Sequence, residues 1–148
     1  MKRIFLILLA VVLFNQSAGC SEGEDAAPPK SRKADYVKAY YFHGDFRCSN
    51  CHEIETYSKE AIDKYFAKEL ASGGLEYEII NIDEKGNGHF AKDYKLYTKS
   101  LVISKIKDGK EAEYKNLEKV WDYLGDKEAF YNYVKEEIAK FLEENKLP

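Results

Sequence analysis

The residues best suited to chemistry in this sequence are two cysteines separated by two residues, Cys48 and Cys51. Apolar residues follow them at spacings of three and four as far as Leu70, which predicts an amphipathic helix ending at Gly73. The first sulfur would lie beside the unpaired backbone N–H groups and the positive dipole of a helix start, and both favour a thiolate. Arg47 adds a neighbouring positive charge, so we predict a lowered pKa for the first thiol. We therefore predict that Cys48 is the nucleophile of a dithiol site and that Cys51 is the resolving thiol.

Other uses of this cysteine pair remain open. A structural zinc site would need four ligands, and the only other cysteine, Cys20, precedes the folded domain. A purely structural disulfide would close a loop so short that it constrains the unfolded chain little. His52 completes the pattern C-x-x-C-H, which is the attachment motif of c-type haem. The distal haem ligand would then have to be His43 or His89, because the only methionine is Met1.

The first nineteen residues have the pattern of a signal peptide. A basic pair, Lys2-Arg3, precedes an unbroken apolar run at 4–14, which is too short to span a bilayer permanently. The small residues Ser17-Ala18-Gly19 before Cys20 are similar to a bacterial lipobox, although Ser17 stands where leucine is usual. We expect residues 1–19 to be removed and Cys20 to be lipidated, with ordinary signal-peptidase cleavage as the alternative. In either case the domain works outside the cytoplasm, where disulfides persist.

Residues 20–35 form a predicted flexible tether. This segment has mixed charges, the pair Pro28-Pro29 and no apolar periodicity, so it would hold the domain away from a membrane surface. Loss of Lys2 and Arg3 with the leader takes the formal net charge from −3 to −5. That acidity argues against nucleic acid as a partner.

The rest of the chain alternates strand and helix patterns. A strand, the dithiol helix and a second strand imply parallel neighbours joined by a crossover, and Asp108-Gly109 predicts a hairpin turn between two later strands. We expect an α/β three-layer sandwich, in which a central mixed sheet of about four strands has helices on both faces. The predicted elements are strands at Tyr36–Phe42, Leu75–Ile82, Leu101–Ile106 and Glu111–Tyr114, a short helix at Phe90–Leu96, and two helices capped by Asn116 and Asp126.

From Tyr36 to Leu142 the chain resembles a thioredoxin. Beyond the cysteine pair, the strand end Asn81-Ile82-Asp83, the segment Ala91-Lys92-Asp93-Tyr94 and the turn Lys107-Asp108-Gly109 carry the resemblance. It implies a thioredoxin-like domain over residues 36–145.

The stretch YYFHGDFRCSNC, together with the lipoprotein-like leader, resembles a bacterial family labelled as a nitrophenyl-compound nitroreductase subunit of the ArsF type. That label describes genetic context more than chemistry. The sequence contains no flavin or nicotinamide fingerprint, so we expect neither nitroreduction nor a bound cofactor, and no metal.

The chain departs from the thioredoxin pattern at several positions. Arg47 stands where thioredoxins have tryptophan, Ser49-Asn50 replaces Gly-Pro, and Phe42 occupies the position of the buried acid that helps move the resolving thiol's proton. We expect His52 to be an exposed helix residue. The cis-proline that faces the dithiol is also missing, so we expect a trans peptide at about Ser100.

These observations predict an exported thiol-disulfide oxidoreductase that uses Cys48 and Cys51, most simply to reduce client disulfides in the cell envelope. The resemblance implies electron supply by a transmembrane thiol-electron transporter of the DsbD/CcdA kind. The direction of electron flow depends on the reduction potential, which these residues do not give. The alternative from another class is a non-catalytic thioredoxin-fold binding module or subunit with a structural disulfide.

Overall fold

The computed structural model describes residues 35–144 of the 148-residue chain. The predicted signal peptide, Cys20 and all of the predicted tether except Asp35 lie outside the described residues. Within residues 35–144, no helix combines the length and the apolarity needed to cross a membrane. The elements in chain order are β1 (Tyr36–His43), α1 (Ser49–Tyr65), α2 (Ala67–Ser72), β2 (Leu75–Asn81), α3 (His89–Asp93), β3 (Ser100–Lys107), β4 (Lys110–Asn116), the 3-10 turn η1 (Glu118–Val120) and α4 (Lys127–Glu144).

The four strands form one mixed sheet in the order β2-β1-β3-β4. Strand β1 runs parallel to β2, with Val37 opposite Leu75, and antiparallel to β3, with Phe42 opposite Ser100. Strands β3 and β4 form the antiparallel hairpin. Both central residues of its turn, Asp108 and Gly109, have positive φ (49° and 73°), as a tight two-residue turn requires. The predicted mixed sheet of about four strands is confirmed.

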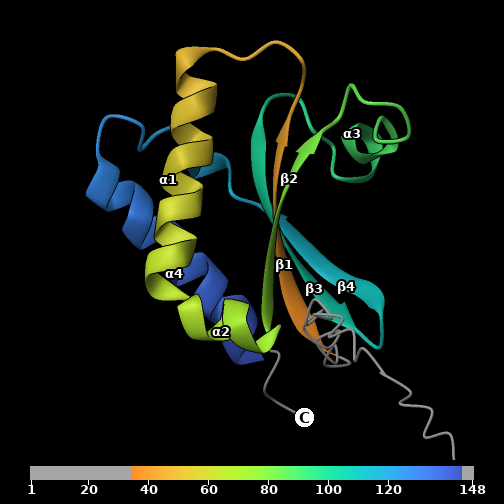
Figure 1. Cartoon of the computed structure of the whole chain (residues 1–148), viewed down its shortest axis with the longest axis vertical. Helices are drawn as coiled ribbons and strands as arrows, with labels where there is room; N and C mark the ends of the chain where they lie inside the picture. The colour runs from red at the N-terminus through yellow and green to blue at the C-terminus, as the bar shows by residue number, and fades with distance from the viewer. Residues whose placement is uncertain (1–34, 145–148) are drawn as a thin grey trace, which may run out of the picture.

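Helices cover both faces of this sheet (Figure 1). Helices α1 and α4 pack on one face and the short α3 lies on the other. Strand β1 is central and largely buried on both sides, which explains why its sequence is apolar except at Lys38 and His43 instead of alternating regularly. On the α3 face, Phe42 packs against Tyr94 with ring centroids 5.3 Å apart.

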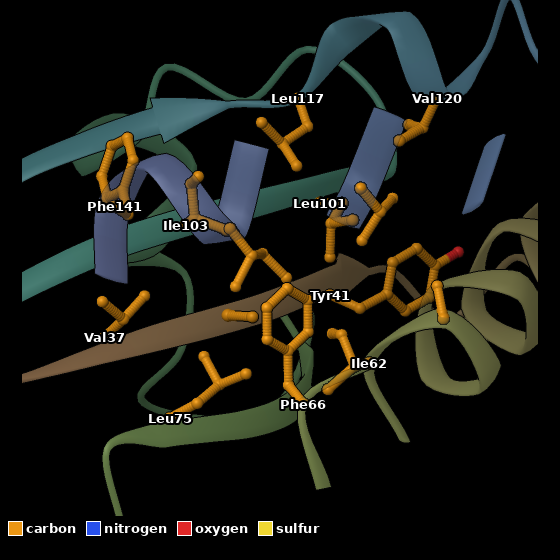
Figure 2. Close-up of a cluster of buried hydrophobic side chains, with 14 of the residues drawn as sticks. Val37, Tyr41, Ile62, Phe66, Leu75, Leu101, Ile103, Leu117, Val120 and Phe141 are labelled. Carbon is orange, nitrogen blue, oxygen red and sulfur yellow. The ribbon is translucent and has the colours of Figure 1, made fainter. Parts of the chain in front are cut away.

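The larger core lies between the sheet and the α1–α4 pair (Figure 2). Side chains from β1, β3 and both long helices interdigitate there, and Tyr41 contributes a ring from the end of β1. The buried members are Val37, Ala39, Tyr41, Ile54, Ala61, Ile62, Phe66, Leu75, Leu101, Ile103, Leu117, Val120, Phe130, Val134, Ile138 and Phe141.

The helix predicted to run unbroken to Gly73 is interrupted at Phe66. Its backbone leaves the helical region (φ −126°, ψ 26°), which ends α1 and starts α2. The Phe66 side chain is buried in the core, and its N–H still bonds to the Ile62 carbonyl at 2.9 Å, so the break costs little backbone hydrogen bonding. The predicted end at Gly73 is confirmed, because this residue adopts the left-handed conformation (φ 74°).

The two predicted helix caps have different outcomes. Asp126 caps α4, since its Oδ1 accepts the Ala129 N–H at 3.0 Å. The cap at Asn116 is wrong, because Asn116 ends β4 opposite Val102 and η1 has no side-chain cap. The strand ends two residues later than expected, at Asn116, and the next residue, the buried Leu117, still donates its N–H to the Leu101 carbonyl of β3 at 2.8 Å.

Candidate dithiol site

Cys48 and Cys51 form a disulfide at the first turn of α1, with their Cα atoms 5.1 Å apart. Cys48 is the N-cap and Cys51 is the third helical residue. The Cys51 N–H points to the Cys48 sulfur (3.3 Å), and the Cys48 N–H points to the Cys51 sulfur (3.1 Å). Each sulfur therefore accepts a backbone N–H, so the pair replaces the usual polar capping side chains of a helix start.

The two sulfurs differ in their access to solvent. Cys51 is 1% exposed, whereas Cys48 is half-buried beside the exposed Ser49 and Asn50. The cause is the helix geometry, because the cap residue sits at the rim while the third residue turns toward the sheet. An incoming thiol or disulfide can therefore approach the first sulfur more easily than the second.

Tyr41, near the end of β1, forms a hydrogen bond to the start of α1. Its hydroxyl donates to the Cys51 carbonyl at 2.6 Å. Burial raises the pKa of Tyr41 to about 12, although the neighbouring Arg47 works in the opposite direction. The phenol therefore stays protonated, and remains a donor, at any physiological pH. The sequence reasoning missed this contact, although the two-residue period of a strand places Tyr41 on the same face of the sheet as Val37 and Ala39.

Arg47 does not lie free beside the dithiol. Its Nη2 pairs with Glu55 Oε2 on the second turn of α1, and its Cζ lies 6.0 Å from the centre of the Tyr41 ring. Its Nε is buried without a hydrogen-bond partner among the described residues. The sequence reasoning treated this charge as available to the first thiol, whereas the structure pairs it with a carboxylate.

The loop between β1 and the dithiol is fixed against the end of β2. Asp83 Oδ2 accepts the Asp45 N–H at 2.7 Å, and Asn81 Nδ2 donates to Asp45 Oδ1 at 2.8 Å. Gly44 permits this approach, because a Cβ there would lie 2.5 Å from Asp83 Oδ2. The residues before Cys48 are therefore held by polar contacts that come from a neighbouring strand.

The loop before β3 contains the position at which the sequence predicts a trans peptide in place of a cis-proline. No peptide bond in residues 35–144 is cis, which confirms the expected trans peptide near Ser100. The Ser100 hydroxyl donates to the Thr98 carbonyl at 2.9 Å, and Trp121 Nε1 donates to the Lys99 carbonyl at 3.0 Å. These bonds hold the loop without a proline.

Two aromatic side chains project into solvent from these loops. Phe46 is 76% exposed and Tyr97 is 97% exposed. Lys99 Nζ lies 5.5 Å from the centre of the Phe46 ring, which joins the two loops. Tyr97 also borders a hollow of about 180 Å³ whose floor includes Leu117 and Trp121. Exposed rings beside a shallow hollow offer an apolar surface to a partner.

The three histidines of the sequence belong to different elements. His52 is exposed on α1, as expected. His43 ends β1 and bonds to the Gly44 carbonyl at 2.9 Å, and His89 begins α3 and pairs with Asp93 at 2.7 Å. Within the described part of the chain, no three His, Cys, Asp or Glu side chains gather as a metal site would need.

The topology β-α-β-α-β-β-α, together with a disulfide at the start of the first helix, defines a thioredoxin-like fold with a C-x-x-C pair. No family model matches the chain, and no curated protein matches it. A solved thioredoxin of Fasciola hepatica is similar to it at 18% identity, over 75% of this chain and 82% of that one, with a TM-score of 0.40. Thioredoxin O2 of Arabidopsis thaliana in the oxidised state is similar at 19% identity, over 69% and 81% of the two chains, with a TM-score of 0.40. Thioredoxin f2 of Chlamydomonas reinhardtii is similar at 10% identity, over 65% and 82%, with a TM-score of 0.36.

Proposed function

We propose that this protein is a thiol-disulfide oxidoreductase that exchanges disulfides with client proteins through Cys48 and Cys51. The observation that carries the proposal is the unequal exposure of two bonded cysteines at one helix start, with Cys51 buried and Cys48 half-buried. A structural cross-link has no need of an accessible sulfur, whereas an exchange reaction needs one accessible and one protected sulfur.

The reaction proceeds in two balanced steps. In the reduced protein the Cys48 thiolate attacks a client disulfide, so that one S–S bond forms, another breaks and a client thiolate leaves. Cys51 then loses its proton to water and attacks the Cys48 sulfur, which forms the intramolecular disulfide and releases the second client thiolate. The client gains two electrons and the protein loses two. The Cys51 N–H, 3.3 Å from the Cys48 sulfur, is placed to stabilise the attacking thiolate.

We further propose that the reaction takes place in the cell envelope and reduces clients. The support comes from the signal-peptide pattern and from Cys20, whose lipidation would anchor the domain to a membrane. A reductant outside the cytoplasm needs electrons from within, so a transmembrane thiol-electron transporter of the DsbD/CcdA kind is the proposed donor. The likeness to the ArsF-type family supports the same setting.

Cysteine variants test the proposal. With insulin as client and a dithiol as electron donor, Cys48→Ser should abolish the protein-catalysed reduction, because the more exposed attacking thiolate is lost. With pre-reduced protein and no added dithiol, Cys51→Ser should accumulate a mixed disulfide with insulin, because the resolving step is lost. Cys20→Ser is the matched control and should reduce insulin at the wild-type rate. Full activity of the Cys48→Ser protein would overturn the proposal.

The non-catalytic binding module remains the second candidate because the exposed Phe46 and Tyr97 offer a docking surface. This function predicts that partner capture is unchanged in the Cys48→Ser and Cys51→Ser proteins and that insulin is not reduced. The intact mass of the exported protein, alkylated before and after reduction, separates these candidates from a c-type haem protein. A haem-sized addition at the two cysteines would contradict both, and a lipid-sized addition would locate the anchor at Cys20.

A further inference from the structure

Arg47 is adjacent to Cys48 in sequence, yet its positive charge is not left unpaired beside the sulfur. It pairs with Glu55, which lies seven residues beyond Cys48. The ion pair is partly buried, so dissolved salt screens it little, and the Glu55 carboxylate offsets the field that the guanidinium alone would exert on the sulfur.

Three contacts fix the guanidinium in this position. Nη2 bonds to the Glu55 carboxylate, Cζ lies over the Tyr41 ring at 6.0 Å, and Nε is enclosed by protein without a partner. Burial of the arginine and glutamate side chains, which are 21% and 25% exposed, strengthens their attraction relative to a fully exposed pair. Glu55 is therefore the group that determines where this positive charge lies.

The other charged or titratable groups near the helix start are already engaged or solvated. Asp45, on the preceding loop, accepts a hydrogen bond from Asn81. Lys99, on the loop before β3, lies over the Phe46 ring. His52, on α1, is exposed. Arg47 is consequently the cation nearest in sequence to Cys48, and its position is decided by a single carboxylate.

We propose that Glu55 is a positioning residue that withholds the Arg47 charge from the Cys48 sulfur and so makes the dithiol a stronger reductant. This inference rests on the proposed dithiol function. Reduction by an external dithiol breaks the Cys48–Cys51 bond, oxidises the donor to its disulfide and leaves a thiolate at Cys48, a thiol at Cys51 and one released proton. A cation close to that thiolate would stabilise the reduced protein and make it more oxidising, as low-pKa thiols are.

The test compares the rate at which Cys48 is alkylated at acidic pH in wild-type and Glu55→Gln protein, with Cys51→Ser in both backgrounds. Release of the guanidinium should raise the thiolate fraction about tenfold, since an opposite charge within about 4–6 Å favours the ionised form by that order. In the proteins that retain both cysteines, the equilibrium with glutathione should shift about tenfold toward the reduced form.

Four further variants identify the cause. Asp63→Asn removes an equal charge from the exposed Lys59 pair on the same helix and should change nothing. Glu55→Asp keeps the carboxylate and should remain near wild type. Arg47→Gln alone should also remain near wild type, because its charge is already withheld, and the Arg47→Gln, Glu55→Gln double variant should reverse the shift.

Several results would overturn the inference. An unchanged alkylation rate in Glu55→Gln would do so, as would a double variant that keeps the faster rate, because Glu55 would then act through its own charge. A tenfold slower alkylation rate in Arg47→Gln would show that the guanidinium already stabilises the Cys48 thiolate. This comparison can be made even if Glu55→Gln fails to fold. Insulin reduction by the protein that retains Glu55 tests the proposed dithiol function by itself. Failure of the Glu55 inference can therefore be distinguished from failure of that function.

Discussion

Removing the Tyr41 hydroxyl should destabilise the protein by about 1 kcal/mol, the net worth of a typical buried hydrogen bond. The hydroxyl is buried and donates to the Cys51 carbonyl at 2.6 Å. That carbonyl also accepts the regular helical bond from Glu55, because α1 continues through this turn. Tyr41→Phe therefore leaves the acceptor with one partner instead of none, which keeps the cost at about 1 kcal/mol and below the larger penalty for a wholly unpaired group.

Tyr77 supplies a matched control on the neighbouring strand. Its hydroxyl is buried and has no hydrogen-bond partner among the described residues. Burial, followed by the charge of Glu55, raises the pKa of Tyr77, so its hydroxyl stays neutral as well. Tyr77→Phe removes a buried polar group that makes no bond, and it should therefore leave stability unchanged or raise it by about 1 kcal/mol.

The assay is urea denaturation of the oxidised proteins at pH 7, with the disulfide verified by mass. Tyr41→Phe should lower the free energy of unfolding and Tyr77→Phe should not, a difference of about 1–2 kcal/mol. Thermal midpoints should differ in the same direction, by about 4 °C or more for each kcal/mol. Equal losses in the two variants would refute the reasoning, because the hydrogen bond from Tyr41 to the Cys51 carbonyl would then contribute nothing to stability.

Two further outcomes follow from single contacts. Gly44→Ala should lower the free energy of unfolding in urea by about 1 kcal/mol, because the new Cβ displaces the Asp83 carboxylate from its hydrogen bond with the Asp45 N–H. Gly125→Ala is the control and should lower it less, because nothing lies within 4 Å of the new Cβ. Burial alone would raise the pKa of Glu137, but hydrogen bonds from two lysines, led by Lys115, lower it from 4.5. A lowered folded-state pKa gives stability that is present above the unfolded value and lost as pH falls, so Glu137→Gln should lose less unfolding free energy than wild type between pH 7 and pH 3. Equal losses in the two proteins would contradict that assignment.

Local patterns were sufficient to predict most of the architecture. The mostly apolar run at 36–42 indicated a buried strand, and Asp108-Gly109 indicated the hairpin turn, both of which the structure contains. The position of Cys48 and Cys51 at a helix start also followed from the spacing of the apolar residues after them. Each of these features depends on neighbours within a few residues, so the sequence order carries the information.

The features that the sequence did not predict depend on tertiary packing. The break at Phe66 has no glycine or proline to mark it, and it arises because the ring turns into the core. Asn116 has a residue type that often caps helices, but its backbone pairs with Val102 in the β3–β4 ladder. The Arg47–Glu55 pair joins a loop to the second turn of a helix, and nothing in the spacing indicates which way the arginine points.

The substitutions around the dithiol affect its tuning more than its construction. The exposed first sulfur, the buried second sulfur and the N–H groups that reach both follow from placing the two cysteines at the cap and third positions of α1. These are backbone properties, and they do not depend on the side chains of Phe42 and Arg47. Those two side chains place no unpaired charge at the helix start, because Phe42 packs in an apolar cluster on the α3 face and Arg47 pairs with Glu55. Construction and tuning therefore depend on different residues in this chain, and for that reason variants at Glu55 can be expected to change thiol reactivity without dismantling the site.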